Sequence, residues 1–315
     1  MPSLRDVHMR PIPVIKYVPK QLRGLWSQCV SRALANAEFH NDVASWTALQ
    51  MLTKSVLCAP PRAGKQHQNQ RIAFTRARMQ RWLDGEYAAL WQDLPTYRVG
   101  KRKVFTEEAE SYMRHKRCED LCREGADSKA CKALCAPGLL DPGAAREEMS
   151  AKHPPASRPV DLSSLSPVNF GLVPDLNVDD LKECLSSFNK HSGGGPSGLR
   201  PFHLRQSLSP AHSDQVLEHL CAVVNMLARG GAHPDIAPWL CGALLMAVPK
   251  KDGSARPIAV GEVLRRLTAK ALCASVKEAA RDYLWPLQVG AAQPLRGRNW
   301  HTGGSAMVPT ITGGS

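Results

Sequence analysis

A tight turn among basic residues is the first feature of the sequence whose residue types suit a ligand. Two short apolar runs flank a segment with Asp252-Gly253, a pair that favours the positive φ of a β-hairpin turn. Such a hairpin brings Lys250, Lys251 and Arg256 to one end. An arginine fork and lysine point charges together suit the oxygens of a triphosphate. The pattern therefore predicts a nucleotide-binding turn, with a solvated turn of the same composition as the alternative.

A glycine-rich stretch, Gly-Gly-Gly-Pro-Ser-Gly at 193–198, lies upstream of this turn. Glycines allow backbone N–H groups to approach a phosphate closely. The stretch is not a P-loop, because no Gly-Lys-Ser/Thr follows it. By itself a linker is the simpler interpretation. Gly64-Lys65 fails the same test, because Gln66 stands where Ser or Thr is required.

Four cysteines form the only candidate metal site. Cys118 and Cys122 are spaced i, i+4, as are Cys131 and Cys135, so the two thiols of each pair share one helix face. A helical hairpin would bring four thiols together for Zn²⁺. The gap between the pairs is short for common zinc modules, and cysteine also packs well in a core. We therefore expect no metal, with these thiols kept as weak zinc candidates.

Carboxylates suited to metal-assisted catalysis are missing after the turn. Nucleotidyl transfer by two metal ions needs acidic side chains that hold the metals. Downstream of the turn the only acidic residues are Glu262, Glu278 and Asp282, which fall within one expected helix. The pair Asp179-Asp180 is typical of the first turn of a helix. We therefore expect no catalytic residue in this chain.

Helices dominate the elements that must position these residues. Apolar spacing predicts the helices, and Asn41-Asp42 predicts a break within the first. The expected helices cover 22–57, 70–94, 106–125, 128–135, 179–188, 214–229 and 261–283, and the hairpin strands cover 243–248 and 256–260. The predicted fold class is mostly α with a small β-hairpin (α+β). Prolines and polar stretches predict a linker at 151–175 between a helical region at 1–150 and a second region at 176–294.

The composition predicts a globular chain with an anionic partner. Its 315 residues are 43% hydrophobic and carry a formal net charge of +13. Lysine and arginine contacts to phosphates release counterions, so a basic chain suits nucleic acid. The longest apolar run, 239–248, is bounded by Pro238 and Pro249 and is far shorter than a membrane span. With a charged N-terminus and ten cysteines, the sequence predicts an intracellular protein, nuclear or cytoplasmic, without a membrane partner.

Four stretches, in this order and spacing, resemble the reverse transcriptase domain of non-LTR retrotransposons. Gly-Pro-Ser-Gly-Leu-Arg at 195–200 is similar to the box that opens that domain. The hairpin segments 244–253 and 256–267 resemble its first two fingers strands and the following helix. Gln-Val-Gly-Ala-Ala-Gln-Pro at 288–294 resembles the segment before the first catalytic aspartate. The upstream helices resemble the flank of this domain, so the resemblance covers 14–294.

The resemblance implies a fold, a partner and roles for particular residues. The fold is a helical N-terminal region followed by partial fingers of a right-hand polymerase. Lys250 or Lys251, and Arg256, match positions that contact the incoming triphosphate. The implied nucleic-acid contacts are Lys190, Arg200 and His203 along the template strand, and Arg265, Arg266 and Lys270 at backbone phosphates. The implied partner is an RNA or DNA template-primer, and Mg²⁺ is the cofactor of the intact parent enzyme.

The departures from the family pattern limit the implied activity. The palm aspartates, the Tyr-x-Asp-Asp turn and the thumb are absent, and from residue 295 the sequence no longer follows the family. We therefore expect a reverse transcriptase fragment whose parent activity is RNA-templated DNA synthesis, truncated before the catalytic motifs, with an unstructured, aberrant tail at 295–315. The alternatives are a stand-alone basic helical nucleic-acid-binding module and a non-functional pseudogene product.

Overall fold

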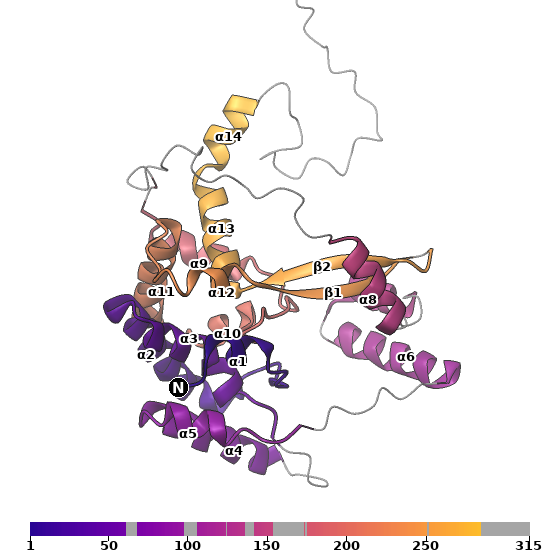
Figure 1. Cartoon of the computed structure of the whole chain (residues 1–315), viewed down its shortest axis with the longest axis horizontal. Coiled ribbons are helices and arrows are strands. Elements are labelled where there is room, and N and C mark those ends of the chain that lie inside the picture. Colours follow the sequence, from indigo (N-terminus) through magenta and orange to yellow (C-terminus); the bar gives the residue numbers. More distant parts are fainter. Residues whose placement is uncertain are drawn as a thin grey trace, which may run out of the picture.

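The computed structural model describes residues 1–60, 68–97, 106–123, 125–135, 142–153, 173, 175–250 and 252–284. The described chain is mostly helical with one two-stranded sheet (Figure 1), which confirms the predicted fold class at that level. The first half contains α1 (Leu4–Met9), η1 (Lys20–Leu22), α2 (Arg23–His40), α3 (Val43–Val56), α4 (Gln68–Leu83), α5 (Tyr87–Gln92), α6 (Glu107–Arg123), α7 (Asp127–Leu134) and α8 (Pro142–Ala151). The second half contains α9 (Val178–Ser186), α10 (Pro201–Gln206), α11 (Ser213–Ala228), α12 (Ala237–Cys241), β1 (Ala243–Pro249), β2 (Ala255–Gly261), α13 (Val263–Ser275) and α14 (Lys277–Leu284).

The break between α2 and α3 lies where the sequence predicts it. Asn41 ends α2 in the left-handed region, with φ 45°, a conformation that asparagine adopts more readily than most residues. Asp42 caps α3 by accepting a hydrogen bond from the Ser45 N–H at 2.7 Å. The Asn41 side chain also accepts from the Trp46 indole at 2.8 Å and donates to the Gly231 carbonyl at 2.8 Å. The break therefore also fastens the segment that follows α11.

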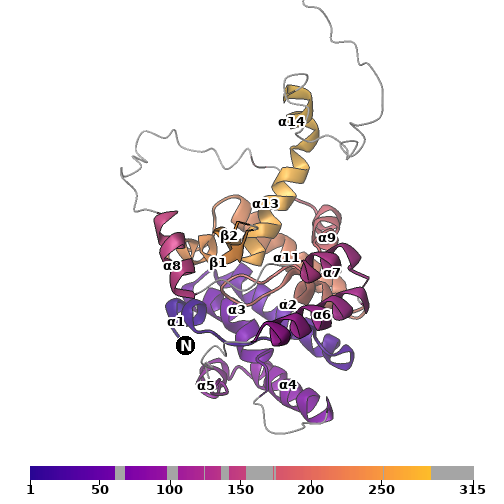
Figure 2. The ribbon, with the colours of Figure 1, turned by 90° about the vertical axis from the view of Figure 1, so that its right-hand side faces the viewer.

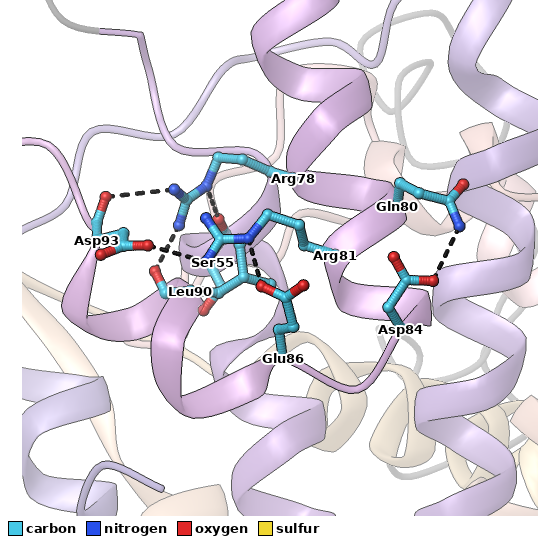
Figure 3. A network of polar contacts seen from close by, with 8 residues as sticks. All are labelled: Ser55, Arg78, Gln80, Arg81, Asp84, Glu86, Leu90 and Asp93. Carbon is cyan, nitrogen blue, oxygen red and sulfur yellow. Dashed lines mark hydrogen bonds and ion pairs between the residues drawn. The ribbon is translucent and has the colours of Figure 1, made fainter.

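The helix predicted over 70–94 is wrong as a single element, because it divides into α4 and α5 at Asp84-Gly85. Gly85 has φ +85°, which a helix interior does not accommodate. A buried arginine holds the two pieces together (Figure 3). The Arg78 guanidinium donates to the carbonyls of Ser55, Leu90 and Asp93, the last two at 2.6 and 3.3 Å. Burial lowers the pKa of Arg78, and these carbonyls, which lie near the ends of α3 and α5, compensate for its desolvation.

The N-terminal helices and the second predicted region share one hydrophobic core. α2 lies beside α11 (Figures 1 and 2), and buried residues of both belong to the same cluster. Polar contacts also join the two regions: the Trp26 indole donates to the His203 carbonyl at 2.9 Å, and the Val18 N–H donates to Gln206 Oε1 at 2.9 Å. The predicted division at 151–175 therefore does not separate two cores. Most of that linker, the 288–294 stretch and the tail at 295–315 lie outside the described residues.

The hairpin has a continuous antiparallel register from Ala243↔Gly261 at its base to Pro249↔Ala255 at its tip. Gly253 takes φ +80° in the turn, as the Asp-Gly signal predicts. One end of α8 is fastened to the tip, because the Ala255 N–H donates to Glu148 Oε2 at 2.8 Å. β2 extends to Gly261 and α13 begins at Val263, so the predicted helix at 261–283 starts too early. It also divides at Val276 into α13 and α14, and α14 continues away from the body (Figures 1 and 2).

Candidate nucleic-acid interface

The glycine-rich stretch packs against the junction of β2 and α13. Ser197 donates through both its backbone N–H and its hydroxyl to the Glu262 carboxylate, each at 2.6 Å. A side chain at Gly195 would lie 2.8 Å from the Glu262 Cα and from the Gly261 carbonyl oxygen. Such an approach to backbone is possible only for glycine. The stretch therefore fixes the point at which the hairpin leaves the body.

A buried lysine connects the same stretch to the N-terminus. Lys54 Nζ donates to the Val7 and Arg10 carbonyls at 2.6 and 2.9 Å. A side chain at Gly198, where φ is +80°, would meet the Lys54 stem. Burial lowers the pKa of Lys54 to about 8, and the Glu262 charge opposes that change. Burial also raises the pKa of Glu262, against the hydrogen bonds from Ser197 and the charge of Lys54.

Two predicted phosphate-contacting residues meet on one aromatic ring. The Arg266 guanidinium lies 5.4 Å from the centroid of the Phe188 ring, and Lys270 Nζ lies 4.7 Å from it. The two cations are i, i+4 on α13, so they share a face. Arg266 also donates to the Gly193 carbonyl at 2.8 Å, and burial lowers its pKa. Lys190, two residues beyond Phe188, is exposed.

The other predicted nucleic-acid residues have more varied surroundings. Arg200 is half-buried directly before α10. Arg265 is exposed and donates to the Cys241 carbonyl at 2.8 Å. His203 is fully buried at 0% exposure. Its Nε2 lies 3.0 Å from the Ile15 carbonyl, which can only accept, so Nε2 carries the proton. The predicted contact of His203 with a template strand does not fit this burial, and the residue instead packs the N-terminal segment against α10.

The predicted nucleotide-binding residues lie at the other end of the hairpin. Lys250 is half-buried in the turn, and Arg256 is exposed opposite Val248 in the register. The Asp252 carboxylate accepts a hydrogen bond from the Ser254 N–H at 2.9 Å. Hydrogen bonds from Ser254 are the main cause that lowers the pKa of Asp252, and the Lys250 charge lowers it further. Lys251 lies outside the described residues. The length of the strands separates this tip from Glu262 by ~20 Å.

The four candidate zinc ligands lie on α6 and α7, which pack against each other. Cys122, Cys131 and Cys135 are exposed and Cys118 is half-buried, so the alternative of core packing does not fit their positions. Desolvation is the main cause that raises the pKa of Cys118, and the nearby thiols of Cys122 and Cys131 raise it further. Within the ranges that the structure describes, no three His, Cys, Asp or Glu side chains form a group suited to a metal ion.

Sequence reasoning missed the residues that hold this interface together. Glu262 looked like an ordinary acidic residue of a helix, yet it stands between a strand and a helix and accepts both Ser197 hydrogen bonds. A carboxylate directly before an apolar helical run was the available signal for a helix start. Lys54 gave no such signal, because its partners are backbone carbonyls of α1 and of the residue that follows it.

No protein-family model, no curated protein and no solved structure matches this chain. Among the helices of the described ranges, none has both the length and the apolar character needed to cross a membrane.

Proposed function

We propose that this chain binds RNA or DNA through a fingers-like region of the reverse transcriptase type, formed by residues 176–284 packed on the N-terminal helices. The observation that carries the proposal is the pair of cations on Phe188. Arg266 and Lys270 share that ring, and neither forms a salt bridge within the described part of the chain. Gathered, unpaired cations on a chain of net charge +13 favour a polyanionic partner.

Some other cations of the protein are neutralised by neighbouring carboxylates. Arg81 bonds Glu86 and Asp93 at 2.6 and 2.8 Å. Arg281 bonds Glu278 and Asp282. A cation outside a salt bridge keeps more of its field for an incoming phosphate than a cation bonded to a carboxylate does. The Phe188 ring restricts where both cations can sit, so less side-chain entropy is lost on binding.

The proposed activity is binding without DNA synthesis. In the parent reaction, the hairpin tip with Lys250 and Arg256 would take the triphosphate, and Mg²⁺ would stabilise the attacking and leaving oxygens. The acidic residues that follow the hairpin in this sequence are Glu262, Glu278 and Asp282. Glu262 is engaged by Ser197, and Glu278 and Asp282 by Arg281. We therefore expect no primer extension on an RNA template with Mg²⁺ and dNTPs, and extension would contradict this part of the proposal.

Fluorescence anisotropy with a labelled single-stranded RNA, titrated over a salt series, tests the binding. The double variant Arg266→Gln/Lys270→Gln should weaken binding and reduce the salt slope by about 1.4, or about 0.7 for each lost phosphate contact. The matched control Arg123→Gln/Arg281→Gln removes the same charge from salt-bridged positions and should bind nearly as the native chain does. Absence of salt-dependent binding, or equal losses in both variants, would refute the proposal.

A further inference from the structure

Contacts between aromatic rings and cations link the N-terminal segment to α13. The first ring is Tyr17, whose edge meets Phe202 at 5.5 Å between centroids and an interplanar angle of 83°. The Arg205 guanidinium lies 5.4 Å from the centroid of the Phe202 ring. Lys16 Nζ lies 5.8 Å from the centroid of the Tyr17 ring. These four residues come from two segments that the sequence separates by more than 180 positions.

Arg205 joins this group to the Phe188 cations. Its Nη1 donates to the Phe188 carbonyl at 3.3 Å, and the Phe188 ring carries Arg266 and Lys270. These contacts join the two groups into one cation–aromatic row. Its members are Lys16, Tyr17, Phe202, Arg205, Phe188, Arg266 and Lys270.

The row gathers four cations, and for Arg266 burial lowers the pKa while the Glu262 charge opposes that change. None of its four cations forms a salt bridge with a residue that the structure describes. Like charges held close together are unfavourable, and cation–π contacts at exposed sites return only ~0.5–1 kcal/mol each. The three rings are half-buried rather than sealed in the core. Such an arrangement suits a ligand that brings both negative charge and flat groups.

We propose that the cation–aromatic row is the binding path for a single strand of nucleic acid. This inference rests on the proposed function and extends it from α13 to Lys16 and Tyr17. A duplex offers its phosphates but keeps its bases stacked inside, so rings would add little to its binding. A single strand offers phosphates to the cations and base faces to the rings and to the planar guanidinium of Arg205. The presence of both rings and cations in the row therefore favours the single strand.

Four labelled ligands test the path: a single-stranded RNA, its DNA equivalent, and a blunt duplex of each. Phe202→Leu should weaken single-strand binding at least about fivefold, from lost base stacking, while leaving the salt slope unchanged. Arg205→Gln should weaken binding and lower the slope by about 0.7. Arg205→Lys retains the charge but lacks the planar guanidinium, so it should keep the salt slope and still weaken binding. The control Phe39→Leu removes a ring that is 71% exposed and meets His219, which is not part of the row, and should leave affinity unchanged.

The outcomes separate this inference from the proposed function. Absence of salt-dependent binding by the native chain would remove both. Loss of binding in Arg266→Gln/Lys270→Gln, with Phe202→Leu and both Arg205 variants equal to the control, would remove the path and keep the function. Duplexes bound as tightly as single strands would overturn the single-strand assignment. If Phe202→Leu disturbs the fold, Arg205→Lys carries the test by itself, provided that its far-UV circular dichroism and melting temperature equal those of the native chain.

Discussion

His203, on α10, forms hydrogen bonds with two other parts of the molecule, α2 and the N-terminal segment. Its carbonyl accepts from the Trp26 indole of α2, and its ring donates to the Ile15 carbonyl. The second ring nitrogen, Nδ1, is buried without a hydrogen-bond partner among the described residues. Protonation there would place an unpaired charge in the core, close to Arg200. Burial is the main cause that lowers the pKa of His203, to about 4.

This burial predicts a loss of stability in mild acid. The unfolded chain takes up a proton at His203 as pH falls through about 6.5, whereas the folded chain resists until about pH 4. Stability should therefore fall through that window, by ~3 kcal/mol for this residue at pH 4. Burial also lowers the pKa of His8, which acts in the same direction. Urea unfolding at pH 7 and pH 4.5 measures the effect.

His203→Gln isolates the contribution of this one residue. Glutamine can still donate to the Ile15 carbonyl but does not titrate. Its unfolding free energy should change less between the two pH values than that of the native chain. Equal changes in both proteins would show that His203 is not the group responsible.

At the scale of elements, the glycine-rich stretch packs so closely on the junction of β2 and α13 that no side chain fits at Gly195. Gly195→Ala should destabilise the protein by roughly 1–3 kcal/mol, because the new Cβ would meet backbone atoms of Gly261 and Glu262 at 2.8 Å. Gly24→Ala is the matched control, since no atom lies within 4 Å of its Cβ position in α2. That change should be neutral or stabilise by up to ~1 kcal/mol. Thermal melting of both variants measures this, and a Gly195→Ala protein as stable as Gly24→Ala would contradict it.

The sequence predicted those elements whose position is determined by neighbouring residues. The Asn41-Asp42 break and the Asp252-Gly253 hairpin appear where those residues require them. The sequence predicts no helix at 142–151, yet α8 forms there. The reason is tertiary: Glu148 and Lys152 bond the backbone of Ala255, a residue more than a hundred positions away.

The candidate site likewise contains some residues that the sequence singled out and others that it did not. The resemblance implies that Arg266 and Lys270 contact backbone phosphates, which stays a prediction, and the structure places both over Phe188. The ring beneath them had no pattern to identify it, because Phe188 comes from a segment far upstream of α13. His203 carried a residue type that suits phosphate contact, and only packing shows that it lies inside. The roles of Lys250 and Arg256 as triphosphate contacts remain predictions.

At the scale of the whole molecule, the shared core predicts that neither predicted region folds alone. A fragment of residues 1–150 would lose the partners of Trp26 and Val18, which are His203 and Gln206. It would also expose the face of α2 that packs on α11. We expect helical circular dichroism, strong binding of a hydrophobic dye and no cooperative melting from this fragment.

Mixing that fragment with residues 151–315 should restore a cooperative transition, since the two pieces together contain the whole core. The full-length chain serves as the control for the melting temperature and for the dye signal. A cooperative melt of residues 1–150 by themselves would show that the first helices form an independent unit.

The pairing of α2 with α10 and α11 also sets the timing of biosynthesis. The Trp26–His203 bond closes a loop of 177 positions, and the Val18–Gln206 bond closes one of 188. At translation rates of ~5–20 residues per second, the ribosome needs roughly 10–40 s to deliver the second partner after the first. During that interval the face of α2 that packs on α10 and α11 lacks its partner, although α2 can already pack on α3 and α4. The nascent chain is therefore suited to be a client of ribosome-associated chaperones, and a ribosome that stalls before α10 would release a species prone to aggregation.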